Sequence, residues 1–108
     1  IVAALREEPG EWAKEALAAM ERASPLSLKL AFEVLRQGRG LEIERALELE
    51  YRVMMHVLAG DDFYEGVRAV LIDKDNQPRW QPASLEAVDR AVIEHHFASL
   101  GERELEIA

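Results

Sequence analysis

Apolar residues recur at intervals of three and four positions along most of this 108-residue chain. That interval places them on one face of an α-helix, whereas a β-strand requires strict alternation, which no useful stretch of the chain shows. Pro, Gly and Ser residues interrupt the pattern and mark where helices begin and end. The pattern predicts an all-α fold, a small multi-helix domain of about five helices, over residues 11–22, 25–36, 41–58, 62–73 and 85–100.

Four of these helices carry an apolar face that we expect to point inward. Helix by helix, the residues are Trp12, Ala16, Ala19 and Met20; Leu28, Ala31, Phe32 and Leu35; Phe63, Val67, Val70 and Leu71; and Val88, Val92, Phe97 and Leu100. Helix 41–58 has a wider apolar arc, made of the stripes Ile43, Leu47, Glu50, Met54 and Ala46, Leu49, Val53, Val57. A wide arc predicts that this helix is covered on more than one side.

Polar residues at the predicted helix starts have the chemistry of caps. Ser24 precedes Pro25, so the hydroxyl can accept a free amide hydrogen bond while Pro at the first helical position loses no partner. Asp62 is followed three residues later by Glu65, which is the spacing of a capping box. Ser84 stands in the same way before the last helix. These signals place the starts of three helices.

Residues 74–83 form the one long irregular stretch that the sequence predicts. Pro78 and Pro82 exclude a helix there, and Trp80 lies between them. A Trp in such a loop is either an anchor that pins the loop onto the helices or an exposed residue at a binding surface, where Trp is enriched. We expect the anchor.

The charge balance limits the classes of partner. There are 21 acidic and 13 basic residues, and the net charge is -8. Such a chain repels nucleic acid and anionic lipid, so we expect neither a nucleic-acid nor a membrane partner. An anionic ligand would need a local basic patch, for which Arg68 and Lys74 are candidates, although a surface salt bridge is the simpler role for each. The chain has no Cys, which excludes disulfides and thiolate chemistry.

Catalytic and metal-binding arrangements are weakly supported. Gly38-Arg39-Gly40 could supply backbone amides to an oxyanion, but it falls between two helices and is better explained as a helix stop. The acids Asp61, Asp62 and Glu65 could form a metal or acid/base cluster, but capping explains the last two. A Ser-His-Asp triad lacks any nucleophile context.

Histidines do not show a metal-ligand spacing either. His95 and His96 are adjacent, so they point about 100° apart on a helix, and His56 is remote in the sequence. Zinc sites on one helix prefer pairs four residues apart. We therefore expect no catalytic residue, no metal ligand and no bound cofactor in this chain.

Several motifs together resemble one branch of a known family. Ser24-Pro25-Leu26-Ser27-Leu28-Lys29 is the first motif, and Glu50-Tyr51-Arg52 is the second. The most specific run starts at Asp62-Phe63 and continues through Glu65-Gly66, Arg68-Ala69 and Ile72-Asp73-Lys74-Asp75 to Pro78, Trp80 and Pro82. His96-Phe97 and Ser99-Leu100 close the pattern. The chain resembles the 3-hydroxyisobutyryl-CoA hydrolases of the enoyl-CoA hydratase/isomerase (crotonase) superfamily.

The resemblance implies a division of labour within a larger protein. Members of the family carry an α/β crotonase core with the catalytic residues, followed by a C-terminal helical region that packs on it. This chain looks like that C-terminal region, without the core: residues 1–23 are a loosely matched lead-in, 24–100 the family-like helices and 101–108 a frayed tail. The parent would hydrolyse an acyl-CoA thioester in valine breakdown. The helices would brace the core, help to close the acyl pocket and be inactive alone.

The resemblance also implies partners and a location. The helix from Phe63 to Lys74 lies near the CoA or acyl end in such proteins, so Phe63, Arg68 and Lys74 are the predicted ligand-proximal residues. The substrate would be held through the absent core, and uncovered apolar helix faces favour a homo-oligomer. The expected location is the bacterial cytoplasm, or the mitochondrial matrix of a eukaryote. Alternatives are a fragment of an enoyl-CoA hydratase or isomerase and a stand-alone helical interaction module.

Overall fold

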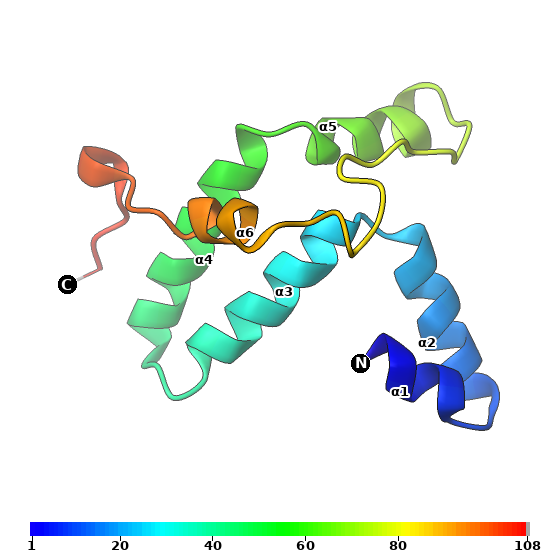
Figure 1. The fold of residues 1–108 in the computed structure, drawn as a ribbon. Coiled ribbons are helices and arrows are strands. Elements are labelled where there is room, and N and C mark those ends of the chain that lie inside the picture. Colours follow the sequence, from blue (N-terminus) through cyan, green and yellow to red (C-terminus); the bar gives the residue numbers. More distant parts are fainter. Residues whose placement is uncertain (108) are drawn as a thin grey trace.

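The computed structural model describes residues 1–107, and their regular structure is entirely helical. The all-α prediction is confirmed. Six α-helices follow one another in Figure 1: α1 Val2–Glu7, α2 Glu11–Arg22, α3 Pro25–Gly38, α4 Ile43–Leu58, α5 Asp62–Val67 and α6 Arg90–His96. A π-helix, η1 Arg68–Ile72, extends α5, and a 3-10 turn, η2 Gly101–Arg103, follows α6. Helix α1 is additional to the five predicted helices and precedes the first of them.

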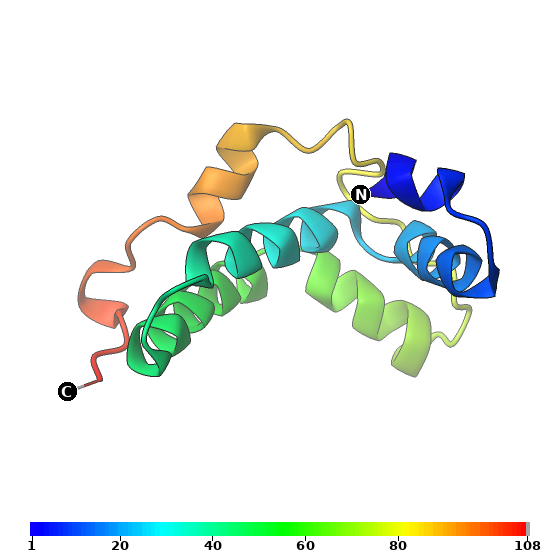
Figure 2. The same cartoon turned by 90° about the horizontal axis from the view of Figure 1, so that it is seen from below.

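The helices form a small central body with an arm at one end. Helices α3 and α4 lie side by side and α6 packs across both, while α5 leaves the end of α4 (Figures 1 and 2). The α1–α2 hairpin, which is the arm, stands beyond the start of α3, and its turn lies at the end of the molecule opposite the C-terminus. The short link at Ala23 and Ser24 joins the arm to the body.

The core lies where α3, α4 and the segment leading into α6 meet. Leu30, Val53, Val88 and Ile93 are buried together, and the half-buried side chains packed around them are Leu26, Val34, Val57 and Phe97. Apolar contact of this kind supplies most of the stability of short helices, which are marginal alone in water.

The predicted inward face of α3 is wrong. Phe32 is 52% exposed and Leu35 is 75% exposed. The core instead takes Leu26, Leu30 and Val34, which lie two positions away along the sequence and hence on roughly the opposite side of the helix. Helix α3 has two apolar faces, and the sequence pattern alone does not say which one the neighbours cover.

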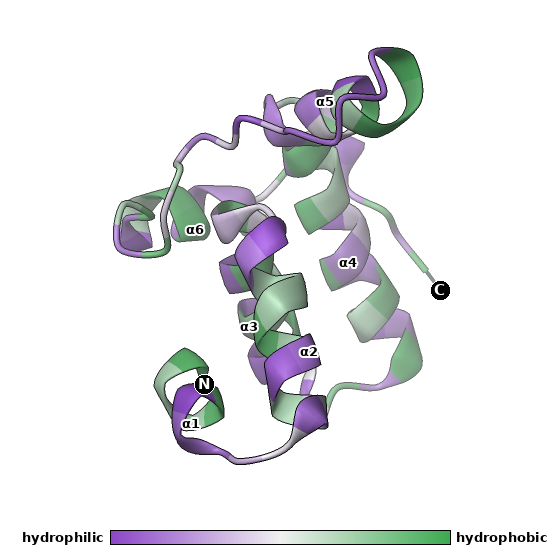
Figure 3. Ribbon diagram, turned by 90° about the vertical axis from the view of Figure 1, so that its right-hand side faces the viewer, coloured by the Kyte–Doolittle hydropathy of each residue, from purple (hydrophilic) through white to green (hydrophobic). Residues whose placement is uncertain are grey.

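Similar reversals occur in other helices. In α2, Ala13 is 1% exposed while Trp12 is 73% exposed. In α4 the stripe with Leu49 and Val53 is buried, but the other stripe stays open, so cover on more than one side is not what the structure shows. Val70 and Leu71 are exposed as well. Figure 3 shows apolar segments along α4 and at the far end of the α5–η1 helix.

The start of the last helix is also different from the prediction. Residues 84–88 form turns, in which the Ser84 hydroxyl accepts a hydrogen bond from the amide of Ala87 at 3.2 Å, and α6 begins only at Arg90. Asp89 between them is extended (ψ 151°). This break directs Val88 into the core, where its carbonyl accepts a hydrogen bond from Lys29 Nζ at 3.3 Å. Ser84 therefore caps a turn and not a helix.

The start of α3 agrees with the prediction. The Ser24 hydroxyl accepts the amide hydrogen bond of Ser27 at 3.2 Å, with Pro25 at the first helical position.

The expected frayed tail is ordered over its first part: Arg52 Nε donates to Glu104 Oε1 at 2.6 Å, and this ion pair lowers the pKa of the Glu104 carboxyl. Residue 108 of the predicted tail lies outside the described residues.

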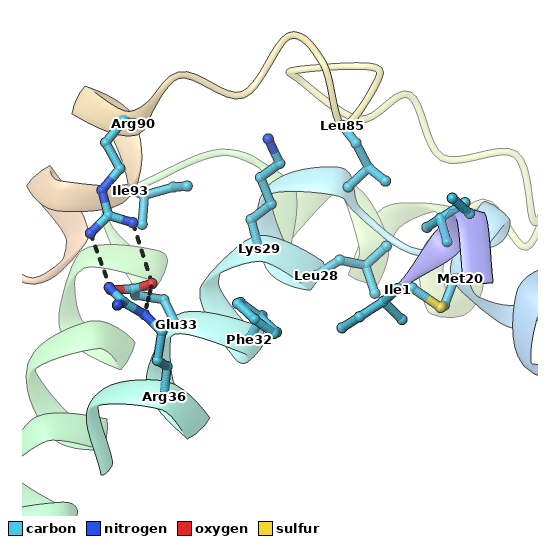
Figure 4. Close-up of a pocket in the computed structure, with 12 residues that line it drawn as sticks. Ile1, Met20, Leu28, Lys29, Phe32, Glu33, Arg36, Leu85, Arg90 and Ile93 are labelled. Atoms are coloured by element: carbon cyan, nitrogen blue, oxygen red, sulfur yellow. Dashed lines mark hydrogen bonds and ion pairs between the residues drawn. The ribbon is translucent and has the colours of Figure 1, made fainter. Parts of the chain in front are cut away.

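A buried carboxylate joins α3 to α6. Glu33 is 3% exposed, and it accepts hydrogen bonds from Arg36 Nε at 3.0 Å, Gln37 Nε2 at 2.9 Å and Arg90 Nη2 at 3.1 Å (Figure 4). Hydrogen bonds from Arg36, and then from Arg90, hold the pKa of Glu33 well below its ordinary value of 4.5. The carboxylate is therefore charged and doubly paired in the folded chain.

The pairing of Glu33 with Arg36 and Arg90, which we call the Glu33 clamp, predicts that the stability of the fold falls in acid. Because folding lowers the pKa of Glu33, its stabilisation is complete above the ordinary value of 4.5 and is lost as the pH falls towards the folded value. We expect the free energy of unfolding, measured by urea titration, to fall between about pH 5 and pH 2. Glu33→Gln should lower stability at neutral pH by about 2 kcal/mol and flatten that fall. Exposed Glu86 is the matched control, and Glu86→Gln should leave the pH profile intact. Equal profiles for both variants would contradict the clamp.

Candidate functional site

The α5–η1 helix and the loop that follows it carry the residues predicted to lie near a ligand. The helix runs to Ile72, close to the predicted end, but its second half is a π-helix in which the amide of Asp73 donates to the carbonyl of Arg68 at 2.8 Å. Lys74 and Asn76 then take left-handed backbone angles (φ 57° and 53°). The amide of Asn76 donates back to Ala69 at 2.9 Å, so the chain reverses tightly there.

The predicted capping box at Asp62 and Glu65 is wrong. The residue before the helix is Asp61, and it makes no side-chain cap. Asp62 is buried, and its two carboxylate oxygens accept hydrogen bonds from the Ser24 hydroxyl at 2.5 Å and from the Gln81 amide at 2.9 Å. One carboxylate thus ties α5 to the start of α3 and to the irregular loop. Both partners are distant in sequence, which is why a local spacing rule missed them.

Arg68 is the centre of a charged cluster that holds the loop. Its guanidinium donates to Glu65 at 2.7 and 2.8 Å, to Asp73 at 2.8 Å and to Asp75 at 2.9 Å. The Glu65 carboxylate also accepts the amide of Arg79 at 2.6 Å. These hydrogen bonds, that of Arg68 first, lower the pKa of Glu65 to about 2, while the carboxylates raise the pKa of Arg68. The simpler role weighed for Arg68, a salt bridge, is the one that the structure shows.

Trp80 anchors the loop, as predicted. Its indole Nε1 donates to the carbonyl of Arg22 at 3.1 Å. Its ring lies over Gly66, where a Cβ would come within 3.3 Å of the ring. A side chain at position 66 would therefore push the ring away, and Gly permits the close approach. Trp80 connects the end of α2, the loop and α5 in a single contact.

An apolar groove lies beside this anchor, and we call it the α5 groove. It has a volume of 510 Å³, and the residues that line it are Ala23, Ser24, Ser27, Val57, Asp62, Phe63, Gly66, Val67, Val70, Leu71 and Trp80. Phe63 is 48% exposed, and its ring meets that of Tyr64 edge to face at 5.5 Å. An open apolar groove with a rigid aromatic wall suits an apolar partner surface or an acyl group.

The three predicted ligand-proximal residues do not form one cluster. Phe63 lines the α5 groove, whereas Arg68 lines a separate polar cavity of 330 Å³ together with Glu65, Asp75 and Arg79. Lys74 is exposed two residues after the end of η1. The acids beside Arg68 oppose a phosphate at that cavity. Contact of these residues with a ligand therefore stays a prediction.

A larger groove lies on the other side of the molecule, and sequence reasoning missed it. This α1–α3 groove has a volume of 750 Å³. Figure 4 shows Arg36 and Arg90 around Glu33 at one end and Met20 and Leu28 at the other. The outward apolar face of α3, with Phe32, forms its floor. The signal in the sequence was the second apolar face of α3 with Lys29 and Arg36 beside it.

The histidines converge, although the sequence spacing gave no reason to expect it. The ring of His56 lies 5.0 Å from that of His95 and 6.1 Å from that of His96, at the contact of α4 and α6. His56 and His96 are hydrogen-bonded to the carbonyls of Ala98 and Val92. Within residues 1–107, no three His, Asp or Glu side chains are arranged to hold a metal ion. Over the same residues, no helix is long and apolar enough to cross a membrane.

Comparison with known proteins decides the family. The sequence pattern of the family described as enoyl-CoA hydratase/isomerase matches residues 1–97. The chain belongs to the enoyl-CoA hydratase/isomerase family. The family prediction is thereby confirmed, and the match extends over the residues that the motifs resembled only loosely.

Several relatives with curated names are hydrolases. The mitochondrial 3-hydroxyisobutyryl-CoA hydrolase of Gallus gallus is 42% identical over 107 residues, 99% of this chain and 28% of that protein. The enzyme of the same name from Homo sapiens is 40% identical over 105 residues, 97% of this chain and 27% of that protein. The chain thus spans little more than a quarter of the length of these relatives.

Solved structures support the fold and carry other names. A crystal structure titled as an enoyl-CoA hydratase from Rhodobacter sphaeroides superposes with a TM-score of 0.91 at 40% identity, covering 99% of this chain and 32% of that one. One titled as a carnitinyl-CoA dehydratase from Mycobacterium thermoresistibile gives 0.88 at 37% identity, covering 97% and 30%. Helices of this arrangement therefore occur within larger members of the family.

Proposed function

We propose that this chain is the C-terminal helical part of a 3-hydroxyisobutyryl-CoA hydrolase that releases CoA from the thioester in valine breakdown. The observation that carries the proposal is the identity of about two residues in five with hydrolases of that name over nearly the whole chain. The helices brace a catalytic core, help to close its acyl pocket and make subunit contacts. The chain alone has no thioesterase activity.

The structure suggests which surface meets the core. The α5 groove is apolar and open, and its wall is fixed by Trp80 and by the Asp62 hydrogen bonds. A rigid apolar surface costs little conformational entropy when it is covered, so it suits a permanent contact with a neighbouring domain. Phe63 would then stand at the acyl side of that contact, while Arg68 keeps the loop in shape.

A second candidate is supported by the solved structures, which are named as a hydratase and a dehydratase. In that case the same helices would serve a core that adds or removes water. The eukaryotic hydrolase relatives are named as mitochondrial. We place the parent protein in the mitochondrial matrix if its source is eukaryotic and in the cytoplasm if it is bacterial.

A chimera tests the proposal. This chain replaces the matching segment of the Gallus gallus hydrolase, and hydrolysis of 3-hydroxyisobutyryl-CoA is followed by release of free thiol. We expect activity within about tenfold of the parent, because the chain brings all the contacts that are buried between its own helices. A matched chimera is made on the Rhodobacter sphaeroides protein and assayed for hydration of an enoyl-CoA.

The two chimeras separate the candidates. An active hydrolase chimera beside an inactive hydratase chimera supports the proposed function, and the reverse result supports the second candidate. Thioester turnover by the 108-residue chain alone, after contaminating enzymes have been removed, would refute its dependence on a core.

A further inference from the structure

Two open surfaces of this chain are complementary to each other. The first is the α1–α3 groove. The second, which we call the α4 stripe, is the uncovered apolar row of α4: Ile43, Leu47, Glu50 and Met54, of which the apolar members are 66%, 45% and 57% exposed. Exposed rows of this kind are unusual on a monomer unless something covers them.

The charges of the two surfaces are opposite. The groove is lined by three cations, Lys29, Arg36 and Arg90, and by the single carboxylate of Glu33, which is buried beneath the two guanidiniums. Arg36 and Arg90 keep 58% and 53% of their side chains exposed. This is a basic surface on a chain whose net charge is -8. The α4 stripe has an exposed carboxylate, Glu50, between Leu47 and Met54.

We propose that the α4 stripe of one copy of this chain docks in the α1–α3 groove of a second copy. The apolar residues of the stripe would cover Phe32 and Leu28 on the groove floor, and Glu50 would meet Arg36 and Arg90. The charge pairing sets the orientation of the incoming helix. The proposal deepens the subunit contacts of the proposed function, since it names the two surfaces that make them.

The geometry fixes the kind of assembly. The groove lies on the side of α3 away from α4, because α4 covers the opposite face with Leu30 and Val34. Each copy therefore offers one donor surface and one different acceptor surface. Such a head-to-tail contact cannot close as a two-fold dimer in which both copies use the same patch, so it builds rings or open chains.

The experiment uses two variants that each remove one surface. Glu50→Arg reverses the charge in the α4 stripe, and Phe32→Glu puts an acid on the groove floor. Both positions are exposed, so the fold should persist, which circular dichroism checks. Light scattering coupled to size exclusion should show oligomers for the unaltered chain. Each variant alone should associate roughly a hundredfold more weakly.

Mixing the variants gives the deciding result. Glu50→Arg retains an intact groove and Phe32→Glu retains an intact stripe, so the mixture should form a one-to-one dimer and nothing larger. Trp12→Ser, at an exposed site outside both surfaces, should associate like the unaltered chain. A monomeric unaltered chain at millimolar concentration, undiminished association of either variant, or a mixture that stays monomeric would overturn the proposal. The chimeras described above do not depend on this outcome, so the failure of one proposal can be told from the failure of the other.

Discussion

Leu30→Ala is expected to lower the free energy of unfolding by about 3 kcal/mol, a large part of the stability of a domain of this size. Leu30 is 4% exposed and packs with Val53, Val88 and Ile93 where three segments meet. Its removal leaves a cavity that these neighbours cannot fill without moving helices. Urea unfolding followed by far-ultraviolet circular dichroism measures the change.

Leu35 offers a matched control on the same helix. It is 75% exposed, so Leu35→Ala should change the free energy of unfolding by no more than about 0.5 kcal/mol. The comparison tests which of the two apolar faces of α3 is the core face. If Leu35→Ala proved the more damaging variant, the packing of α3 described here would be wrong.

Trp80→Ala should cost about 2.5 kcal/mol and release the loop of residues 74–83. The half-buried indole joins the loop to the end of α2 and to Gly66. Without it the loop is held mainly by its hydrogen bonds to Asp62 and Glu65, and these open more often once the apolar contact with α5 is lost. Hydrogen exchange of the Gln81 amide should quicken while the amides of α3 exchange almost as before.

Trp12 is the control for this variant. It is 73% exposed on α2, so Trp12→Ala should leave both stability and loop exchange nearly unchanged. Tryptophan emission adds an independent check, because the remaining indole reports a different environment in each variant. Equal losses of stability in the two variants would contradict the anchoring role of Trp80.

The sequence predicted where most helices are but not which faces they bury. The spacing of apolar residues and the helix caps depend on residues that are near in the sequence. Ser24 and Pro25 therefore predict the start of α3 correctly. Burial depends on neighbours that are distant in the sequence. Helix α3 has two apolar faces, and only the positions of α4 and α6 select Leu30 over Phe32.

The same distinction applies to the candidate site. The anchoring role of Trp80 is confirmed, and the alternative of an exposed residue at a binding surface is not what the contacts with Arg22 and Gly66 show. The capping-box prediction for Asp62 and Glu65 is wrong because their partners Gln81 and Arg79 lie beyond the helix in the irregular loop. The second apolar face of α3 was the one local sign of the α1–α3 groove, and its other walls come from segments that only folding brings together.

The carboxylate of Glu33 has a consequence for how the chain chooses one structure. Its charge is tolerable away from water only when guanidinium groups of α3 and α6 both reach it. A shift of α6 by one helical turn along α3 and α4 would keep much of its apolar contact. It would, however, leave the Glu33 carboxylate buried without the guanidinium of Arg90. We therefore expect Arg36 and Arg90 to give the fold specificity: misregistered arrangements of α6 that apolar packing alone would tolerate are destabilised by an unpaired buried carboxylate.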